Sequence, residues 1–227
     1  MKPNKGCYYN FVRFCRSTLV FIVCFLLVAC AVSNDRRHPE LSNRLQPIKI
    51  LCILPADIII YEELPDGRLV HRRDWSQAVH DDLKQTLVDE LTTKDYRVLI
   101  YPEGDSDRSG ELYEILTLYR AVNKSIQLHT FGPDIFPAKK FHFKYSVGPL
   151  QALSESKKAD AYIFTRVLYR VSDQQARSYV SLGLADDTGT ILWYGANGSR
   201  GPAGGKSFDS TLVLVRNILT DFPEEKL

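Results

Sequence analysis

The sequence predicts an α/β protein in which helices pack on one mixed sheet. After residue 48, a short apolar run, a helical repeat and a second apolar run follow one another. This order requires a parallel, right-handed strand–helix–strand crossover. Three strand-like segments separated by turn residues then fill residues 160–194, which predicts an antiparallel meander. The predicted order is therefore strand, helix, strand, helix, helix, a three-stranded meander and a C-terminal helix.

The first half of the body alternates strand and helix signals. Residues 48–54 are continuously apolar, which is typical of a strand buried on both faces. After Pro55 the chain continues extended over residues 58–61, turns at 64–68 and returns as a short strand at 69–71. A helix is predicted from Trp75 to about residue 93, with Asp74 as its N-cap, because its apolar side chains repeat every four residues. Residues 97–101 form the next strand, which Pro102 ends.

The second half begins with a helix near Ser109, because apolar side chains recur there at spacings of three and four residues. Residues 129–147 have no clear period, and we expect an ordered loop lying over the body. A short helix is predicted over 149–157. The meander strands are expected at the following residues: 160–171, 178–185 and 190–194. The last helix runs from Asp209 to Phe222, where Pro223 ends it.

The amino terminus has the pattern of an export signal. Residues 1–29 contain four basic residues and no acidic residue, and a 13-residue apolar run begins at Ser17. The run ends in Leu27, Val28, Ala29 and Cys30. These four residues resemble the lipobox of bacterial lipoproteins. The resemblance implies a diacylglycerol on the Cys30 sulfur, cleavage before Cys30 and acylation of the new amino terminus. The alternative is an uncleaved membrane anchor, since the apolar stretch to Ser33 spans 17 residues.

Lipidation of Cys30 would determine both the domain boundaries and the cellular location of the protein. We expect a signal peptide over residues 1–29, a lipidated Cys30 followed by a polar tether over 30–47, and a single α/β domain over 48–227. Several acyl chains hold a protein firmly on a bilayer. The residue after Cys30 is Ala31 and not the Asp that lipoprotein sorting reads as inner-membrane retention. The resemblance therefore implies the periplasmic face of the outer membrane.

The charge of the body argues against one class of function, and its cysteine content leaves one cysteine to be explained. Without residues 1–29, the chain has 25 basic against 27 acidic residues. A neutral-to-acidic body argues against nucleic-acid binding, which needs a basic footprint. After removal of the signal, Cys52 is the one cysteine besides Cys30. It lies within an apolar run, so we expect a buried small hydrophobe.

Several segments resemble small bacterial lipoproteins. An Ile-Leu-Pro strand ends at residues 53–55, and an Asp-x-Thr-Gly hairpin followed by Leu-Trp occupies 186–193. These segments are similar to the curli secretion lipoprotein, the lipoprotein activators of penicillin-binding proteins and the amino-terminal domain of TolB. Uncharacterised predicted lipoproteins share further segments of this sequence: 56–62, Trp75, 143–149 and 159–164. The resemblance implies an α/β fold and an envelope location, and it implies no chemistry.

Two motifs resemble ligand loops but lack essential residues. Residues 201–207 end in Gly-Lys-Ser, yet Arg200 stands where a phosphate-binding loop needs Gly, and Pro202 lacks an N–H donor. Asp105 and Asp107 resemble the start of a calcium loop, but position twelve is Leu116 and not Glu. An acidic loop capping the following helix is the alternative. The five histidines have no zinc-ligand spacing. We therefore expect no nucleotide, no metal and no cofactor.

One segment predicts a partner surface. Within residues 129–147, Phe136, Phe141, Phe143 and Tyr145 are interleaved with lysines. Aromatic side chains that stay exposed indicate a protein-binding site, and the alternative is that they fold back onto the sheet.

The absence of any recognisable catalytic set leads to three functional hypotheses. The first is a non-enzymatic outer-membrane lipoprotein that binds other envelope proteins as an assembly or regulatory subunit. The second is an auxiliary lipoprotein of a lipid or solute transport system that binds a small apolar ligand, for which a long hydrophobic cavity would be evidence. The third, an envelope enzyme, would need a cleft with convergent titratable residues.

Overall fold

The structure is a computed structural model, and it describes residues 35–102, 110–131, 136–151, 153, 158–202 and 208–224. The chain divides into a first unit, Met1–Ser33, and a second unit, Asn34–Leu227. All that follows concerns the second unit. Among its described residues, no helix combines the length and the apolar composition that crossing a bilayer requires.

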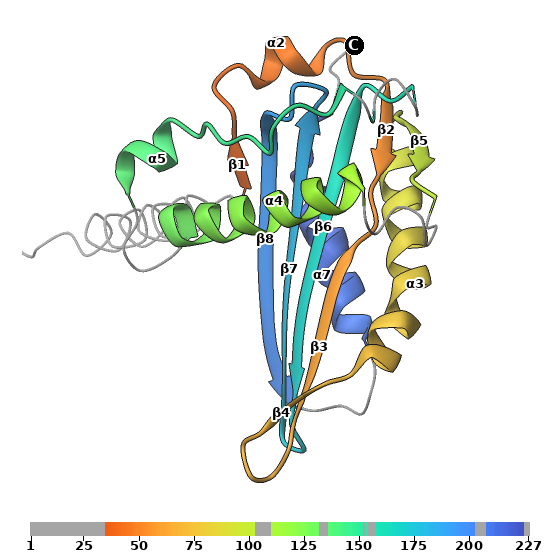
Figure 1. Cartoon of the computed structure of the whole chain (residues 1–227), viewed down its shortest axis with the longest axis vertical. Helices are drawn as coiled ribbons and strands as arrows, with labels where there is room; N and C mark the ends of the chain where they lie inside the picture. The colour runs from red at the N-terminus through yellow and green to blue at the C-terminus, as the bar shows by residue number, and fades with distance from the viewer. Residues whose placement is uncertain are drawn as a thin grey trace, which may run out of the picture. The chain divides into compact units, whose positions relative to one another are not determined.

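The second unit is built on one mixed sheet, as predicted (Figure 1). The strands are β1 (Asp35–Arg37), β2 (Ile50–Ile53), β3 (Asp57–Glu63), β4 (Leu69–His71), β5 (Arg97–Ile100), β6 (Ala161–Val171), β7 (Gln175–Asp186) and β8 (Ile191–Pro202). Their order is β1-β8-β7-β6-β2-β5. β3 continues from β2 along the same edge of β6 and also pairs with β4. The pairs β2–β5, β2–β6 and β3–β6 are parallel, and the meander β6–β7–β8 is antiparallel.

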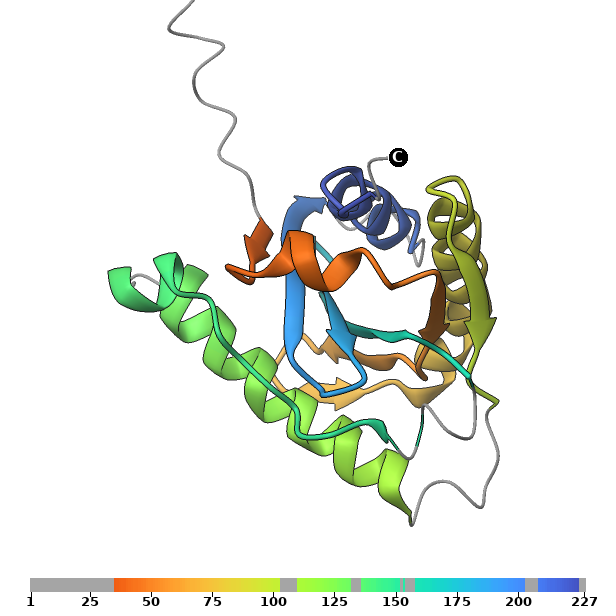
Figure 2. The ribbon, with the colours of Figure 1, turned by 90° about the horizontal axis from the view of Figure 1, so that it is seen from above.

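The helices lie on both faces of this sheet. They are α2 (Leu41–Leu45), α3 (Arg73–Thr92), α4 (Glu111–Ile126), the π-helical turn η2 (Gln127–Phe131), α5 (Pro137–Phe141) and α7 (Asp209–Thr220). Figure 2 shows α3 and α7 together on one face and α4 on the other. The predicted crossover β2–α3–β5 is confirmed, because Ile50 pairs in parallel with Arg97. The predicted helix over 149–157 lies largely outside the described residues.

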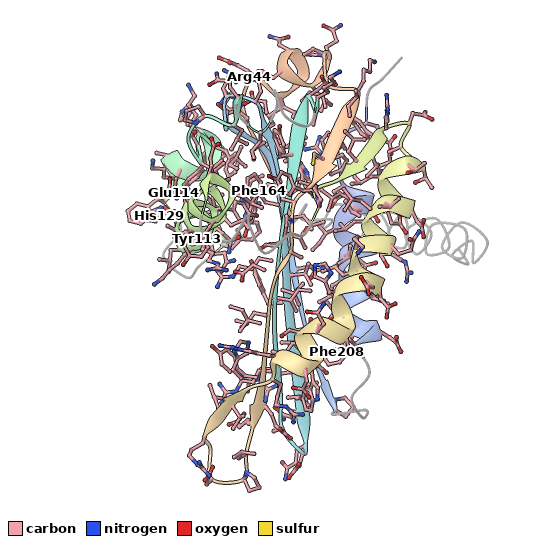
Figure 3. All side chains as sticks on the ribbon, turned by 45° about the vertical axis from the view of Figure 1, so that its right-hand side comes forward. Arg44, Tyr113, Glu114, His129, Phe164 and Phe208 are labelled. Carbon is pink, nitrogen blue, oxygen red and sulfur yellow. The ribbon has the colours of Figure 1, made fainter. Side chains whose placement is uncertain are left out.

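Each face of the sheet has its own apolar core. The core on the α3–α7 side includes Leu83, Leu87 and Leu91 from the predicted stripe of α3, all exposed by 1% or less. The core on the α4 side includes Tyr119 of α4 and Phe164 of β6, whose rings stack with centroids 4.4 Å apart. Figure 3 shows Phe164 on the side of the sheet that faces α4 and Phe208 on the opposite side, beside α3. The two cores fix α4 and the α3–α7 pair to opposite faces of the meander.

The expected polar tether is wrong for residues 35–47, which belong to the folded unit. β1 pairs antiparallel with β8, with Arg36 opposite Tyr194. In α2, Leu41 and Leu45 are buried in the core on the α3–α7 side. A three-residue strand is stabilised by backbone hydrogen bonds, and a five-residue helix shows only two apolar positions. Neither β1 nor α2 therefore shows the hydrophobic periodicity in the sequence from which the other elements were predicted.

Three further expectations need correction. α3 begins at Arg73, so Asp74 is not its N-cap; its carboxylate instead pairs with the guanidinium of Arg72 at 2.7 Å. The segment 129–147, expected to be a loop, is partly helical, because η2 continues α4 as far as Phe131 and residues 137–141 form α5. β8 runs to Pro202 and not to residue 194. Its three glycines lower the intrinsic strand propensity of this segment, but pairing with β7 keeps it extended.

Candidate interaction surfaces

The chain projects a small aromatic surface beyond the edge of the sheet. The end of α4, η2 and α5 extend past β8 and β1 (Figures 1 and 2). Three apolar side chains there are exposed: Leu128 by 55%, Phe136 by 56% and Phe141 by 75%. We call these three residues the aromatic projection. Exposed apolar side chains that are grouped in this way indicate a contact surface.

His129 of η2 organises this projection. Its carbonyl oxygen accepts a hydrogen bond of 3.0 Å from the N–H of Phe136. The two rings meet edge to face with centroids 5.1 Å apart. The Nδ1 of His129 also lies 3.2 Å from the Ser125 hydroxyl oxygen and 3.4 Å from the phenol oxygen of Tyr145. Phe136 is therefore held in place although it is exposed to solvent.

β1 ties the base of the projection to the sheet. The guanidinium of Arg36 donates a hydrogen bond of 2.6 Å to the carbonyl oxygen of Thr130. It also lies over the ring of Phe131 at 4.0 Å, a cation–π contact. Arg36 belongs to the segment that was expected to be a tether. This segment instead supports the predicted partner surface.

The four aromatic residues predicted for this surface have different environments. Phe136 and Phe141 are exposed, Tyr145 is half-buried and Phe143 is fully buried. The prediction is therefore wrong for Phe143, which belongs to the α4-side core. The physical reason is that residues 143–147 run in extended conformation beside the meander, where Ser146 bridges to Thr190, so successive side chains alternate between core and solvent.

The contact between α4 and the sheet contains a buried polar cluster that the sequence did not predict. The side-chain oxygen of Asn123 accepts hydrogen bonds from the Ser181 hydroxyl at 2.9 Å and from the Tyr194 phenol at 2.7 Å. Burial raises the pKa values of Tyr119, Tyr179 and Tyr194 above that of free tyrosine. These phenols stay neutral, the three rings pack in or against the α4-side core, and the hydroxyl of Tyr194 donates to Asn123.

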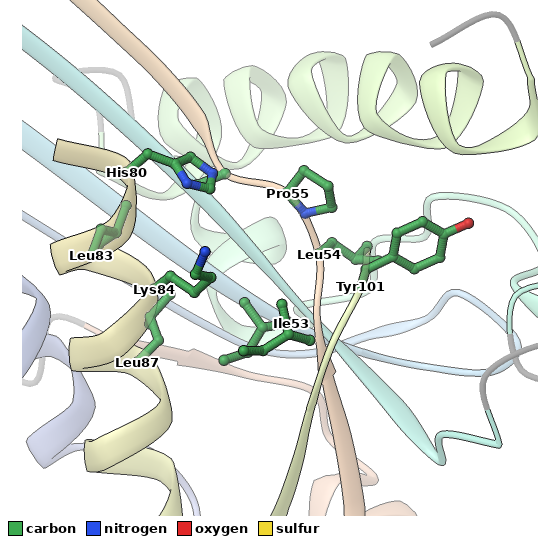
Figure 4. Close-up of a pocket in the computed structure, with 10 residues that line it drawn as sticks. Ile53, Leu54, Pro55, His80, Leu83, Lys84, Leu87 and Tyr101 are labelled. Carbon is green, nitrogen blue, oxygen red and sulfur yellow. The ribbon is translucent and has the colours of Figure 1, made fainter. Parts of the chain in front are cut away.

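The pocket in Figure 4 lies between α3 and the carboxyl ends of β2 and β5. His80 and Lys84 of α3 face apolar residues such as Ile53 and Leu54 across it. Its volume is about 10 Å³, which holds about one water molecule. A larger hollow of about 930 Å³ lies between α2 and residues 220–224, and most of its lining residues are polar. Neither has the size and apolar lining that the small-ligand hypothesis needs.

The remaining predicted sites have the following outcomes. Cys52 is fully buried, as expected. No cluster of three or more His, Cys, Asp or Glu suited to a metal ion occurs among the described residues. The possible calcium residues Asp105 and Asp107 lie outside the described residues. So do Cys30 and the cleavage motif Leu27, Val28 and Ala29.

Comparisons with known proteins return lipoproteins among solved structures. No family model matches the sequence, and no curated protein matches it. A lipoprotein of Neisseria meningitidis, GNA1162, is 15% identical with a TM-score of 0.38, covering 76% of this chain and 95% of its own. The C-terminal domain of LpoB from Salmonella enterica is 8% identical with a TM-score of 0.28, covering 72% of this chain and 95% of its own. A protein whose structure is described as that of an uncharacterized protein is 10% identical with a TM-score of 0.35, and the match covers 76% of this chain and 86% of that protein.

LpoB is a penicillin-binding-protein activator lipoprotein, and such lipoproteins are among the groups that the sequence segments resemble. Identities of 15% or less and TM-scores below 0.4 transfer no activity, partner or location to this chain. The function of the chain therefore has to be argued from its own residues.

Proposed function

We propose that this protein is a lipoprotein held by acylated Cys30 on the periplasmic face of the outer membrane, and that it binds another envelope protein without catalysing a reaction. The aromatic projection is the observation that carries the proposal. Phe141 exposes 75% of its surface and Phe136 exposes 56%. Aromatic side chains are enriched at protein interfaces, and burial of such side chains against a partner contributes strongly to binding affinity.

The projection has the composition of an interface centre with a polar rim. Lys124 and Lys139 are exposed beside its apolar side chains. The ammonium of Lys139 lies 5.6 Å from the ring centre of Tyr145. Because His129 holds Phe136 and Arg36 holds the end of η2, little conformational entropy of these groups would be lost on binding. A partner would therefore meet a surface that is already organised.

The anchor part of the proposal rests on the sequence. A basic segment, an apolar run and the residues Leu27, Val28, Ala29 and Cys30 precede the folded unit. Only four residues separate Cys30 from Asp35, the first residue of β1. Even a fully extended chain would span at most about 18 Å over that distance. A lipid on Cys30 would therefore hold the folded unit closer to the bilayer than a tether ending at residue 47 would.

The test combines lipid analysis with crosslinking in intact cells. Mass spectrometry of the mature protein should find an acylated Cys30 at the amino terminus, and Cys30→Ala should abolish both processing and acylation. A photoreactive phenylalanine analogue at position 141 should capture one defined envelope protein. The same analogue at Val213, which is 49% exposed on α7, is the matched control.

Two results would contradict the proposal. A mature chain without acyl groups on Cys30 would remove the anchor. Crosslinks from position 141 that are absent, or that are the same as those from position 213, would remove the aromatic projection as a binding surface. Adding Phe136→Ala should weaken the specific crosslink, because this ring lies in the same projection.

A further inference from the structure

Three arginines lie side by side across the far end of the meander. Arg170 of β6 is directly opposite Arg177 of β7, and Arg177 is directly opposite Arg200 of β8. Side chains that are directly opposite in antiparallel strands point to the same face of the sheet. The strand alternation places this row on the α4 face, because Ser181, four residues from Arg177, bonds to Asn123 of α4.

No described helix crosses this part of the sheet on the α4 face. α4 crosses the same strands nearer their other end (Figure 1). Arg177 and Arg200 are exposed, and the side chain of Arg170 is 40% exposed. Between this row and α4 lies a row of apolar and aromatic side chains in register, formed by Ile59, Leu168 and Tyr179. Leu168 is 41% exposed. We call these six residues the arginine face.

The positive charge of this region is only partly compensated. Glu63 holds Arg170 through two contacts of 2.9 and 2.8 Å. The amide oxygen of Gln175 accepts two hydrogen bonds from Arg200. Arg177 makes no ion pair or side-chain hydrogen bond with any described residue, although its charge helps to lower the pKa of Glu63, mainly set by the hydrogen bond from Arg170.

A second pair of arginines extends the charge toward α4. Arg120 of α4 and Arg166 of β6 both pair with Asp57, at 3.0 and 3.3 Å. Among the described residues, the five arginines of this region have two carboxylate partners, Asp57 and Glu63. Like charges directly opposite on a sheet are destabilising. Glu63 compensates Arg170 and Gln175 holds Arg200, but no described side chain pairs with Arg177, the central arginine of the row, and binding of an acidic partner would compensate it.

We propose that the arginine face docks an acidic segment of a partner protein, with carboxylates against the arginine row and an apolar side chain against Leu168. The proposal rests on the proposed protein-binding function and adds a second surface with a defined chemistry. Arginine and tyrosine are the residues that interface centres favour. A second copy presenting the same face would bring arginine against arginine, so electrostatics disfavours that occupant.

The test uses the purified full chain and a random copolymer of glutamate and tyrosine as the probe. Combining Arg170→Gln, Arg177→Gln and Arg200→Gln should weaken copolymer binding by about tenfold or more. The matched control combines Arg37→Gln, Arg97→Gln and Arg216→Gln, which remove the same charge from exposed positions elsewhere. This control should change the affinity by less than about threefold.

Two further variants control for misfolding and for binding through charge alone. Arg177→Gln removes no ion pair or side-chain hydrogen bond with a described residue, so its fold should be intact, and it alone should weaken binding of the copolymer. Leu168→Asn should also weaken binding of the copolymer but leave binding of inorganic polyphosphate unchanged, because polyphosphate has no apolar group.

The outcomes separate this proposal from the proposed function. Equal copolymer affinity in the arginine-row variant and the control variant would overturn it. A Leu168→Asn chain that binds the copolymer as well as the unmodified chain would also overturn it, since the surface would then recognise any polyanion. Neither result depends on Cys30 acylation or on crosslinking at position 141, so the two proposals can fail separately.

Discussion

The two faces of the meander differ although the same three strands form both. On the α3–α7 face, inward side chains such as Ile163 and Val180 are apolar and buried in the core, and the apolar pattern continues to the far end. On the α4 face, β6 begins with two buried aromatic side chains, Tyr162 and Phe164, and continues with Arg166, Leu168 and Arg170. The first face is covered along its length, while the second is covered by described helices only under α4.

This difference shows that the side chains along one strand indicate which part of a sheet face is covered by a helix. β6 alternates between its faces without interruption, so only the chemistry of its α4-facing side chains changes along the strand. The two aromatic side chains are buried in the α4-side core, and Arg166 shares Asp57 with Arg120 of α4. Beyond Arg166, Leu168 and Arg170 lie on the open part of the sheet. We interpret the covered part as structural and the open part as available to a partner.

The largest expected effect is a difference in unfolding free energy between substitutions at two positions of β6 on the α4 face. Phe164→Ala removes a fully buried ring under α4 and should lower the free energy of unfolding by about 3–5 kcal/mol. Leu168→Ala lies on the same face beyond α4 and should cost less than about 1 kcal/mol. Urea denaturation measures both. Equal losses would show that the open part is covered in the isolated chain.

The buried polar cluster should give the next effect. Asn123→Ala leaves the hydroxyls of Ser181 and Tyr194 without their acceptor and should cost about 2–4 kcal/mol of unfolding free energy. Adding Ser181→Ala and Tyr194→Phe should recover part of this loss, because the two hydroxyls that lost their acceptor are then removed. Denaturation of the single and triple variants tests this. A triple variant less stable than Asn123→Ala would contradict the assignment.

The open part should behave in the opposite way. Arg177→Gln removes a charge that lies between two others and should raise the unfolding free energy by about 0.2–1 kcal/mol, while weakening the binding of an acidic partner. Thermal denaturation at low salt checks the direction, and the gain should shrink at high salt. A loss of stability would mean that Arg177 is a structural residue.

The smallest effect concerns pH and the segment that contains β1 and α2. Burial lowers the pKa of His38, and the charge of Arg44 lowers it further. Protonation of His38 therefore favours the unfolded chain, so stability is highest above the unfolded pKa of about 6.5 and falls as the pH drops through that value toward the lower folded one. His38→Gln should reduce the loss between about pH 7.5 and 5.5, measured by denaturation.

The sequence predicted the elements whose signal is periodic and local. The four-residue stripe of α3, the buried strand β2 and the start of the meander were all visible in the order of apolar residues. β1 and the second half of β8 were not, because pairing with a neighbouring strand determines them and not their own side chains.

The candidate surfaces were predictable only in part for the same reason. The aromatic content of residues 129–147 indicated a contact surface, but exposure of Phe141 and burial of Phe143 depend on the tertiary structure. The arginine row could not be seen at all, because Arg170, Arg177 and Arg200 become neighbours only through the strand register. Asn123 looks like any polar helix residue until Ser181 and Tyr194 lie against it.

Accessibility of Leu168 to a thiol reagent tests the central claim, that the open face serves a partner, most directly. Leu168→Cys gives a thiol on this face, and Cys52 in the core is buried. A bulky maleimide should label the purified chain rapidly but label the chain in intact cells far more slowly, while Val213→Cys on α7 should react alike in both. Equal labelling of Leu168→Cys in the two settings would contradict the account.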